Sequence, residues 1–112
     1  METNILYEYL ELIEKGLDDV GSNELFKAIL EQSEYVLLLT DSDLAFEMQM
    51  TRPTINRWRS GANAPLVPMR KNIYNKLKRR TNLMIKKSVE ANAQTVAVKA
   101  KASAKEAESP NS

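Results

Sequence analysis

The segment over residues 44–65 constrains the fold most, because it places two short helical patterns on either side of a tight turn. The inward-facing positions of the two patterns are apolar: Leu44, Ala45 and Met48 in the first, Ile55 and Trp58 in the second, and Met50 in the turn. Apolar residues spaced three and four apart lie on one face of a helix. The segment therefore predicts two helices that pack on a common core across a short turn.

The outward positions of the second helix carry cationic and hydrogen-bonding side chains: Arg52, Thr54, Asn56, Arg57 and Arg59. A guanidinium group can donate two hydrogen bonds to guanine, and a carboxamide can pair with adenine in the same forked manner. A helix that presents such groups from a helix-turn-helix can lie in the major groove. The pattern therefore favours sequence-specific binding of double-stranded DNA.

Several features of residues 40–65 occur together in one known family: Leu44-Ala45, Met50-Thr51, Thr54-Ile55, Trp58, Gly61 and Pro65. On these residues the chain resembles the lambda-repressor-like (Cro/XRE-type) helix-turn-helix DNA-binding domain. With helical patterns on both sides, the resemblance covers roughly residues 23–78. It implies an all-α, five-helix bundle, to which this chain would add an extra N-terminal helix, and a transcriptional regulator, a repressor of prokaryotic or phage type. Family members commonly bind palindromic sites as dimers, so a homodimer is a further expectation.

The resemblance also implies roles for individual residues. Base edges would be read by the start and outward face of the second helix, through Thr51, Arg52, Pro53, Asn56 and Arg57. DNA phosphates would be held by neighbouring positions and by the helix that follows, through Ser42, Thr54, Arg59, Asn63, Arg70, Lys71 and Lys78. For two of these arginines, Arg59 and Arg70, the alternative is an ion pair with Asp41, Asp43 or Glu47. The basic run over residues 76–87 could likewise be only a solvated helix face.

Two positions depart from the family pattern. Many relatives have glycine in the turn, where a residue with positive φ is needed, but the chain has none near Met48-Gln49. A side chain held there costs about 1 kcal/mol. Asp41 stands at the start of the first helix of the helix-turn-helix, where relatives often place an uncharged side chain that donates a hydrogen bond to a phosphate. A carboxylate at that position would repel the DNA backbone unless it is turned away or paired.

Cap and turn signals predict the remaining helices. A helix over residues 3–15 would end at Gly16, and it would either cover the bundle or pair with its counterpart in a dimer. Counted along the whole chain, the next helix is expected over residues 23–36. The two helices of the helix-turn-helix follow, one after the Thr40–Asp43 capping box and one between Thr51 and Gly61. A fifth would run from about residue 66 or 68 through at least residue 77, with an extension toward residue 88. The expected organisation is an accessory helix and loop (1–20), a helix-turn-helix domain (21–88) and a disordered, low-complexity tail (89–112).

Composition argues against catalysis. The chain has no cysteine and no histidine, so it lacks a thiol nucleophile and the commonest general base and metal ligand. Its three glycines stand alone, so no phosphate-binding loop is present. We therefore expect no enzyme, no cofactor, no metal and no small-molecule ligand. No apolar run is long enough for a membrane span and the acidic start is wrong for a signal peptide, so a cytoplasmic, nucleoid-associated protein is expected.

The net charge of +1 conceals a strong segregation of charge. Residues 1–48 carry twelve Asp or Glu and two Lys, whereas residues 49–90 carry eleven Lys or Arg and one Glu. A basic surface facing phosphates would explain this asymmetry. Attraction between the two halves within the fold is the alternative explanation. The acidic half also supports a rival function, a protein-interaction adaptor that docks through that surface.

Overall fold

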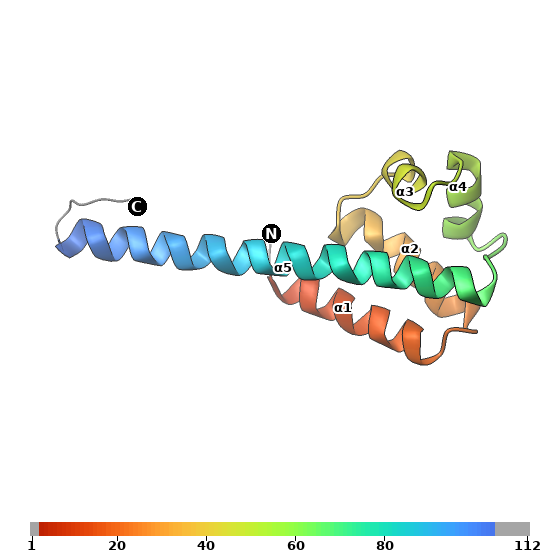
Figure 1. Cartoon of the computed structure of the whole chain (residues 1–112), viewed down its shortest axis with the longest axis horizontal. Helices are drawn as coiled ribbons and strands as arrows, with labels where there is room; N and C mark the ends of the chain where they lie inside the picture. Colours follow the sequence, from red (N-terminus) through yellow and green to blue (C-terminus); the bar gives the residue numbers. More distant parts are fainter. Residues whose placement is uncertain (1–2, 105–112) are drawn as a thin grey trace.

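The computed structural model describes the backbone of residues 3–104 and the side chains of residues 4–91. Over that range the chain is all-helical and contains no strand (Figure 1). Its five helices are α1 (Thr3–Asp18), α2 (Asn23–Val36), α3 (Asp41–Met48), α4 (Arg52–Ser60) and α5 (Val67–Ala104). The all-α expectation is therefore confirmed. No helix within the described residues combines the length and apolar character needed to cross a membrane.

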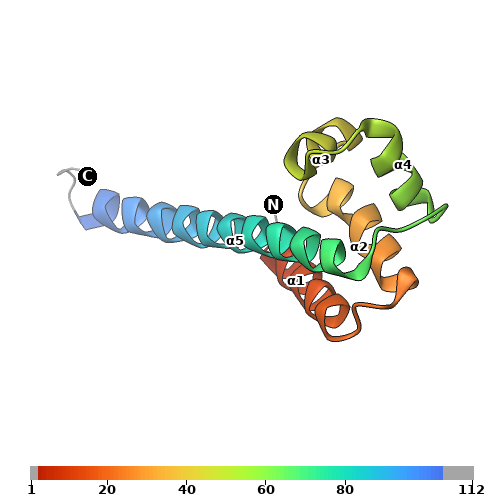
Figure 2. The same cartoon turned by 45° about the vertical axis from the view of Figure 1, so that its right-hand side comes forward.

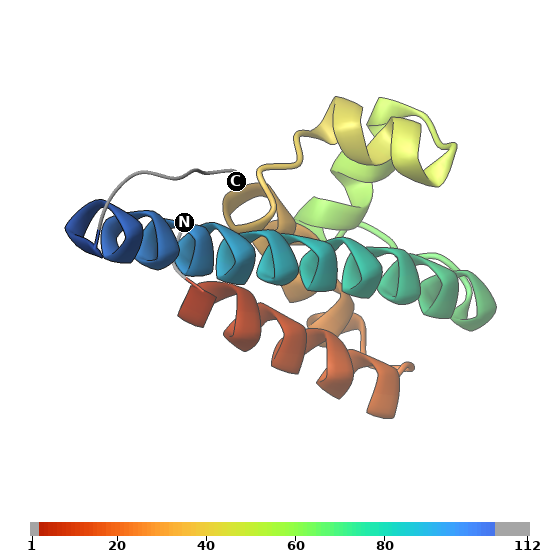
Figure 3. The ribbon, with the colours of Figure 1, turned by 60° about the vertical axis from the view of Figure 1, so that its left-hand side comes forward.

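The helix α1 belongs to the packed bundle and runs antiparallel to the first half of α5 (Figure 3). Its apolar side chains Leu6, Tyr9 and Ile13 are at most 1% exposed. The hydroxyl of Tyr9 donates a hydrogen bond of 2.7 Å to the backbone carbonyl of Ile29 on α2. Of the two arrangements expected for this helix, packing on the bundle is the one observed. It follows that α1 is one of the five helices and not an addition to them.

The prediction that Gly16 ends this helix is wrong, because α1 continues to Asp18. A Cβ atom at position 16 would lie 2.7 Å from Cδ1 of Ile29 and 3.0 Å from the ring of Tyr74. Glycine therefore allows α1 to approach α2 and α5 closely. A glycine that ends a helix and a glycine that lets two helices pack closely cannot be told apart in a sequence, because neither has a side chain.

The core brings all five helices together. The ring of Phe26 on α2 packs edge-on against Trp58 of α4, with ring centres 5.8 Å apart, and in a tilted arrangement against Tyr74 of α5, with ring centres 5.9 Å apart. Trp58 is only 5% exposed, which confirms that it wedges between helices and is not a surface platform. Leu44 and Ile55 on α3 and α4 are fully buried. The α3–α4 unit (residues 41–60) is thereby held on α2, above α5 (Figure 2).

Local caps determine where α3 and α4 begin and end. Thr40 and Asp43 form the expected capping box, with reciprocal hydrogen bonds of 3.1 and 3.0 Å. The bond that the backbone N–H of Thr40 donates to the Asp43 carboxylate is the main reason that the pKa of this carboxyl lies below its ordinary value. In the turn, Gln49 adopts the left-handed conformation with φ of 57°, as expected for the position that lacks glycine. Thr51 caps α4, and Gly61 ends it with φ of 84°.

The helix α5 extends far beyond the other four helices (Figure 1). Disorder was predicted from residue 89 onward, but the backbone is helical through Ala104. Residues 89–104 contain six alanines and no glycine or proline, so intrinsic propensity favours the helix even without tertiary contacts. The rest of the predicted tail, residues 105–112, lies outside the described residues.

Candidate nucleic-acid interface

The outward face of α4 gathers all five residues that the sequence assigned to base reading. Thr51, Arg52, Pro53, Asn56 and Arg57 are exposed. Four of them, together with Asp41 of α3, line one shallow hollow on the surface. Ile55 and Trp58 anchor the opposite face of the same helix in the core. The helix is thus fixed from below and presents two guanidinium groups and one carboxamide to solvent.

The first turn of α4 is ordered by its own side chains. The hydroxyl oxygens of Thr51 and Thr54 lie 2.9 Å apart, and the backbone N–H of Thr54 donates to the Thr51 hydroxyl at 3.4 Å. One turn later, Nη2 of Arg57 donates to the Thr54 hydroxyl at 3.4 Å. Pro53 stands in the first turn, where its missing N–H has no helical partner to lose. Thr54 is half-buried, and its hydroxyl already has Thr51 and Arg57 as hydrogen-bond partners.

Asp41 is turned toward α4 and paired. Its Oδ1 lies 3.0 Å from Nε of Arg59, and its Oδ2 accepts a hydrogen bond of 3.4 Å from Nδ2 of Asn56. The departure from the family pattern therefore has a structural explanation. A carboxylate that would repel phosphates as a free group is partly neutralised by a neighbouring guanidinium.

Arg59 is not a surface residue, which corrects its predicted role in phosphate binding. Only 7% exposed, it pairs with Glu34 at 3.0 Å as well as with Asp41. Its Nη2 donates to the carbonyl of Leu39 at 2.7 Å and to the hydroxyl of Ser33 at 3.3 Å. Arg59 thus ties α4 to the end of α2 and to the connector before α3. The ion pair with Asp41 is one of the alternatives that the sequence left open.

Arg70 also has a structural position, and its predicted phosphate contact is corrected in the same way. It is 8% exposed, and its Nε donates to the carbonyl of Pro65 at 2.8 Å. Its Nη1 donates to the carbonyl of Val20 at 3.1 Å, and the guanidinium lies 5.7 Å from the centre of the Phe26 ring. Arg70 therefore connects α5 to the loop between α1 and α2 and to the loop between α4 and α5.

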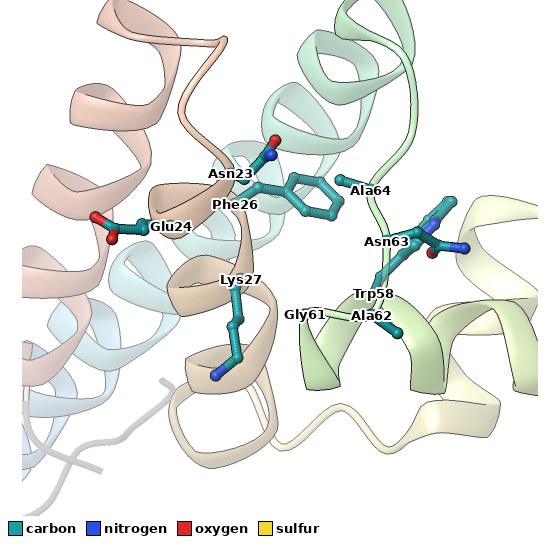
Figure 4. A pocket seen from close by; sticks show the side chains of 9 residues that line it. All are labelled: Asn23, Glu24, Phe26, Lys27, Trp58, Gly61, Ala62, Asn63 and Ala64. Atoms are coloured by element: carbon teal, nitrogen blue, oxygen red, sulfur yellow. The ribbon is translucent and has the colours of Figure 1, made fainter.

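The other predicted phosphate ligands lie at or near the surface. Ser42, Asn63 and Lys71 are exposed, whereas Lys78 is half-buried and pairs with Glu14 of α1 at 2.6 Å. Asn63 lines an open pocket between α2 and the loop after α4, opposite Lys27 (Figure 4). These residues come from separate parts of the bundle: Ser42 lies in the α3–α4 unit and Asn63 just after it, whereas Lys71 and Lys78 are on α5.

One cation of the basic run over residues 76–87 lies near the turn, although it was not among the phosphate ligands singled out from the sequence. Lys76 on α5 is exposed and lines a small cleft together with Gln49 and Met50 of the turn. Helical periodicity predicts that Lys76 is exposed, but only the packing of α5 against the turn shows that it lies beside Gln49 and Met50. Lys76 is thus a further surface cation beside the α3–α4 unit.

Internal pairing accounts for only part of the charge segregation. Within the described side chains, three cations of residues 49–90 form ion pairs with the acidic half: Arg59, Lys78 and Arg80, the last with Glu47 at 3.0 Å. The exposed cations without an ion pair in that range are Arg52, Arg57, Lys71, Lys76, Arg79, Lys86 and Lys87. Attraction between the two halves therefore does not account for most of the exposed positive charge.

Nothing in the described side chains suggests a reaction centre. No group of three or more acidic, histidine or cysteine side chains among them is arranged to hold a metal ion. The clearest raised pKa values belong to Tyr9 and Tyr74, the latter raised to about 12, and burial is the main cause for both. These tyrosines stay neutral in the core and contribute packing. Comparisons of the chain with protein-family models, with curated proteins and with solved structures find no match.

Proposed function

We propose that the protein binds double-stranded DNA sequence-specifically through α4, as a helix-turn-helix transcriptional regulator of the lambda-repressor-like type. The observation that carries this proposal is the exposed cluster of Arg52, Asn56 and Arg57 on one face of a helix whose opposite face is buried. Rigid presentation of a few forked donors is what major-groove reading requires.

The side chains of this cluster suit a mixed sequence. Arg52 and Arg57 can each donate two hydrogen bonds to O6 and N7 of guanine, and Asn56 can pair with adenine. Pro53 offers only apolar contact, which fits a thymine methyl group. In the proposed complex, Thr51 at the start of α4 contacts the edge of the groove. Each good bidentate pair discriminates against other bases by about 1–3 kcal/mol.

Phosphate contacts would come from polar and basic groups of the α3–α4 unit, of the loop that follows it and of α5. Arg59 and Arg70 leave the predicted set because they are buried and paired. Ser42, Thr54, Asn63, Lys71 and Lys78 stay in it, and Lys76 joins it because it lies beside the turn. These contacts would position the helix and make binding dependent on salt.

The test is selection from a randomised duplex pool at physiological salt, with sequencing of the bound fraction. A recovered motif is expected, and Asn56→Ala and Arg52→Ala should each weaken the preference at one base pair. A palindrome with half-sites about 34 Å apart would indicate a dimer. Binding without any motif, or no binding, would refute the proposed function.

A second function is favoured by one observation. The outer surface of α1 has an acidic hollow lined by Asn4, Tyr7, Glu8, Leu10, Glu11 and Glu14. Tyr7 is 49% exposed there, so a cationic segment of a partner protein would find both charge and apolar contact. The double substitution Glu8→Lys with Glu11→Lys separates the two functions: it should abolish such a partnership and leave a DNA motif unchanged.

A further inference from the structure

Asp41 connects the base-reading face to the core. Its two carboxylate oxygens have different partners: Oδ1 pairs with buried Arg59, and Oδ2 accepts from the side-chain amide of exposed Asn56. Arg59 is itself held by Glu34 and by the Leu39 carbonyl. The carboxamide of Asn56 is therefore linked, through one carboxylate, to a guanidinium that cannot move freely.

The link restricts how Asn56 can face DNA. A carboxamide has an acceptor oxygen and two N–H donors, and it can be turned over to exchange the oxygen and nitrogen positions. Only the nitrogen can donate to a carboxylate, so Asp41 draws that end toward α3 and leaves the oxygen and the second N–H available. Adenine in the major groove needs both an acceptor and a donor in a fixed order.

The same carboxylate has a disadvantage for DNA binding. A negative charge at the start of α3, next to the hollow lined by Arg52 and Arg57, weakens attraction to phosphates of any sequence. Arg59 would retain Glu34, Ser33 and Leu39 as partners without it. Three of the four partners of Arg59 therefore remain when this carboxylate is removed, and only its Nε loses its neighbour.

We infer that Asp41 is a positioning residue, which orients the Asn56 amide for adenine and gains discrimination at one base pair at the expense of general affinity. This inference rests on the proposed DNA-binding function. Asp41 itself contacts no base in this arrangement.

The experiment compares Asp41→Ala with Glu34→Ala in the full-length protein. Glu34 is the matched control, because it pairs with Arg59 at the same distance of 3.0 Å but is not bonded to Asn56. Selected motifs and titrations on duplexes with each base at each position are measured for the wild type, both variants, Asn56→Ala and Asp41→Ala/Asn56→Ala. The position read by Asn56 is the one whose preference Asn56→Ala removes.

For Asp41→Ala we expect the adenine preference at that position to fall about fivefold, because the amide regains its rotational freedom. Affinity for all duplexes should rise a few-fold at low salt, as a negative charge is lost. Glu34→Ala should leave the preference unchanged. In the double variant, loss of Asp41 should have no further effect at that position.

Three results would overturn the inference. A uniform gain in affinity with the preference unchanged would make Asp41 a purely electrostatic and structural residue. An equal loss of preference in Glu34→Ala would assign the effect to anchoring of α4 by Arg59. A wild-type protein that selects no motif would refute the proposed function and this inference together, whereas the first two results leave the proposed function standing.

Discussion

Replacement of Arg59 by alanine tests whether this arginine belongs to the core or to the DNA interface. The hydrogen bond from its guanidinium to the buried carbonyl of Leu39 is charge-assisted and is worth about 1.5–3 kcal/mol. The pair with Glu34, whose side chain is 54% exposed, adds at most about 1 kcal/mol. Ser33 keeps its own bond to Leu30, so its hydroxyl is not left without a partner. We therefore expect the free energy of unfolding to fall by about 3 kcal/mol.

A loss of this size lowers the melting temperature by about 12–20 °C in a domain of this length. Urea unfolding followed by helical circular dichroism measures it directly, and the fluorescence of buried Trp58 provides a second probe. Arg52→Ala is the matched control, since it removes an exposed guanidinium from the same helix and should change stability by no more than about 0.5 kcal/mol. Equal stability of the two variants, with a weaker salt dependence of DNA binding for Arg59→Ala, would refute the structural role of Arg59.

Three further substitutions have expected outcomes. Gly16→Ala should destabilise the protein by about 1–2 kcal/mol despite the higher helix propensity of alanine, because the new Cβ would lie 2.7 Å from Cδ1 of Ile29. The control Gly21→Ala should leave stability unchanged, since a Cβ there would have no atom within 4 Å, and equal urea midpoints for the two variants would contradict the close packing of α1 at Gly16. Tyr74→Phe should be neutral or stabilise by up to about 1 kcal/mol, since the buried hydroxyl has no hydrogen-bond partner among the described residues; a marked loss of stability at neutral pH would argue against an unpartnered hydroxyl. The substitution should also remove the contribution of Tyr74 to the stability lost between pH 10 and about 12, where deprotonation favours the unfolded chain, whereas the contribution of Tyr9 should persist. Arg52→Ala should reduce discrimination at one base pair by about 1–3 kcal/mol in competition titrations, whereas a uniform loss across sequences would make Arg52 a phosphate contact.

The helices that sequence reasoning located best are those with local start and stop signals. Residues 23–36 form a helix as predicted, α3 begins at the cap that Thr40 marks, and α4 begins and ends at the positions that Thr51 and Gly61 mark. A cap is a contact between residues at most a few positions apart, so its geometry is already implied by the order of residue types. The same locality explains why the exposed face of α4 could be predicted from periodicity.

The errors concern residues whose role depends on distant neighbours. Arg59 looked like a member of the outward face because it follows Trp58 at the edge of the apolar stripe, yet its partners come from α2, the following connector and the start of α3. Arg70 is bonded to Val20, fifty positions away. A cation in a sequence is charged in either setting, and only the packing decides whether it meets protein carbonyls or solvent.

The sequence alone determined that the fold of the described residues is all-α, where α2, α3 and α4 lie, and which side of α4 carries Arg52, Asn56 and Arg57. These properties follow from short-range periodicity and capping, which are encoded within a few consecutive residues. The tertiary structure decided which cations are available, why glycine stands at position 16, and how Asp41 is joined to Asn56. Each of these depends on contacts between segments far apart along the chain, and such contacts are determined by the way whole helices pack together.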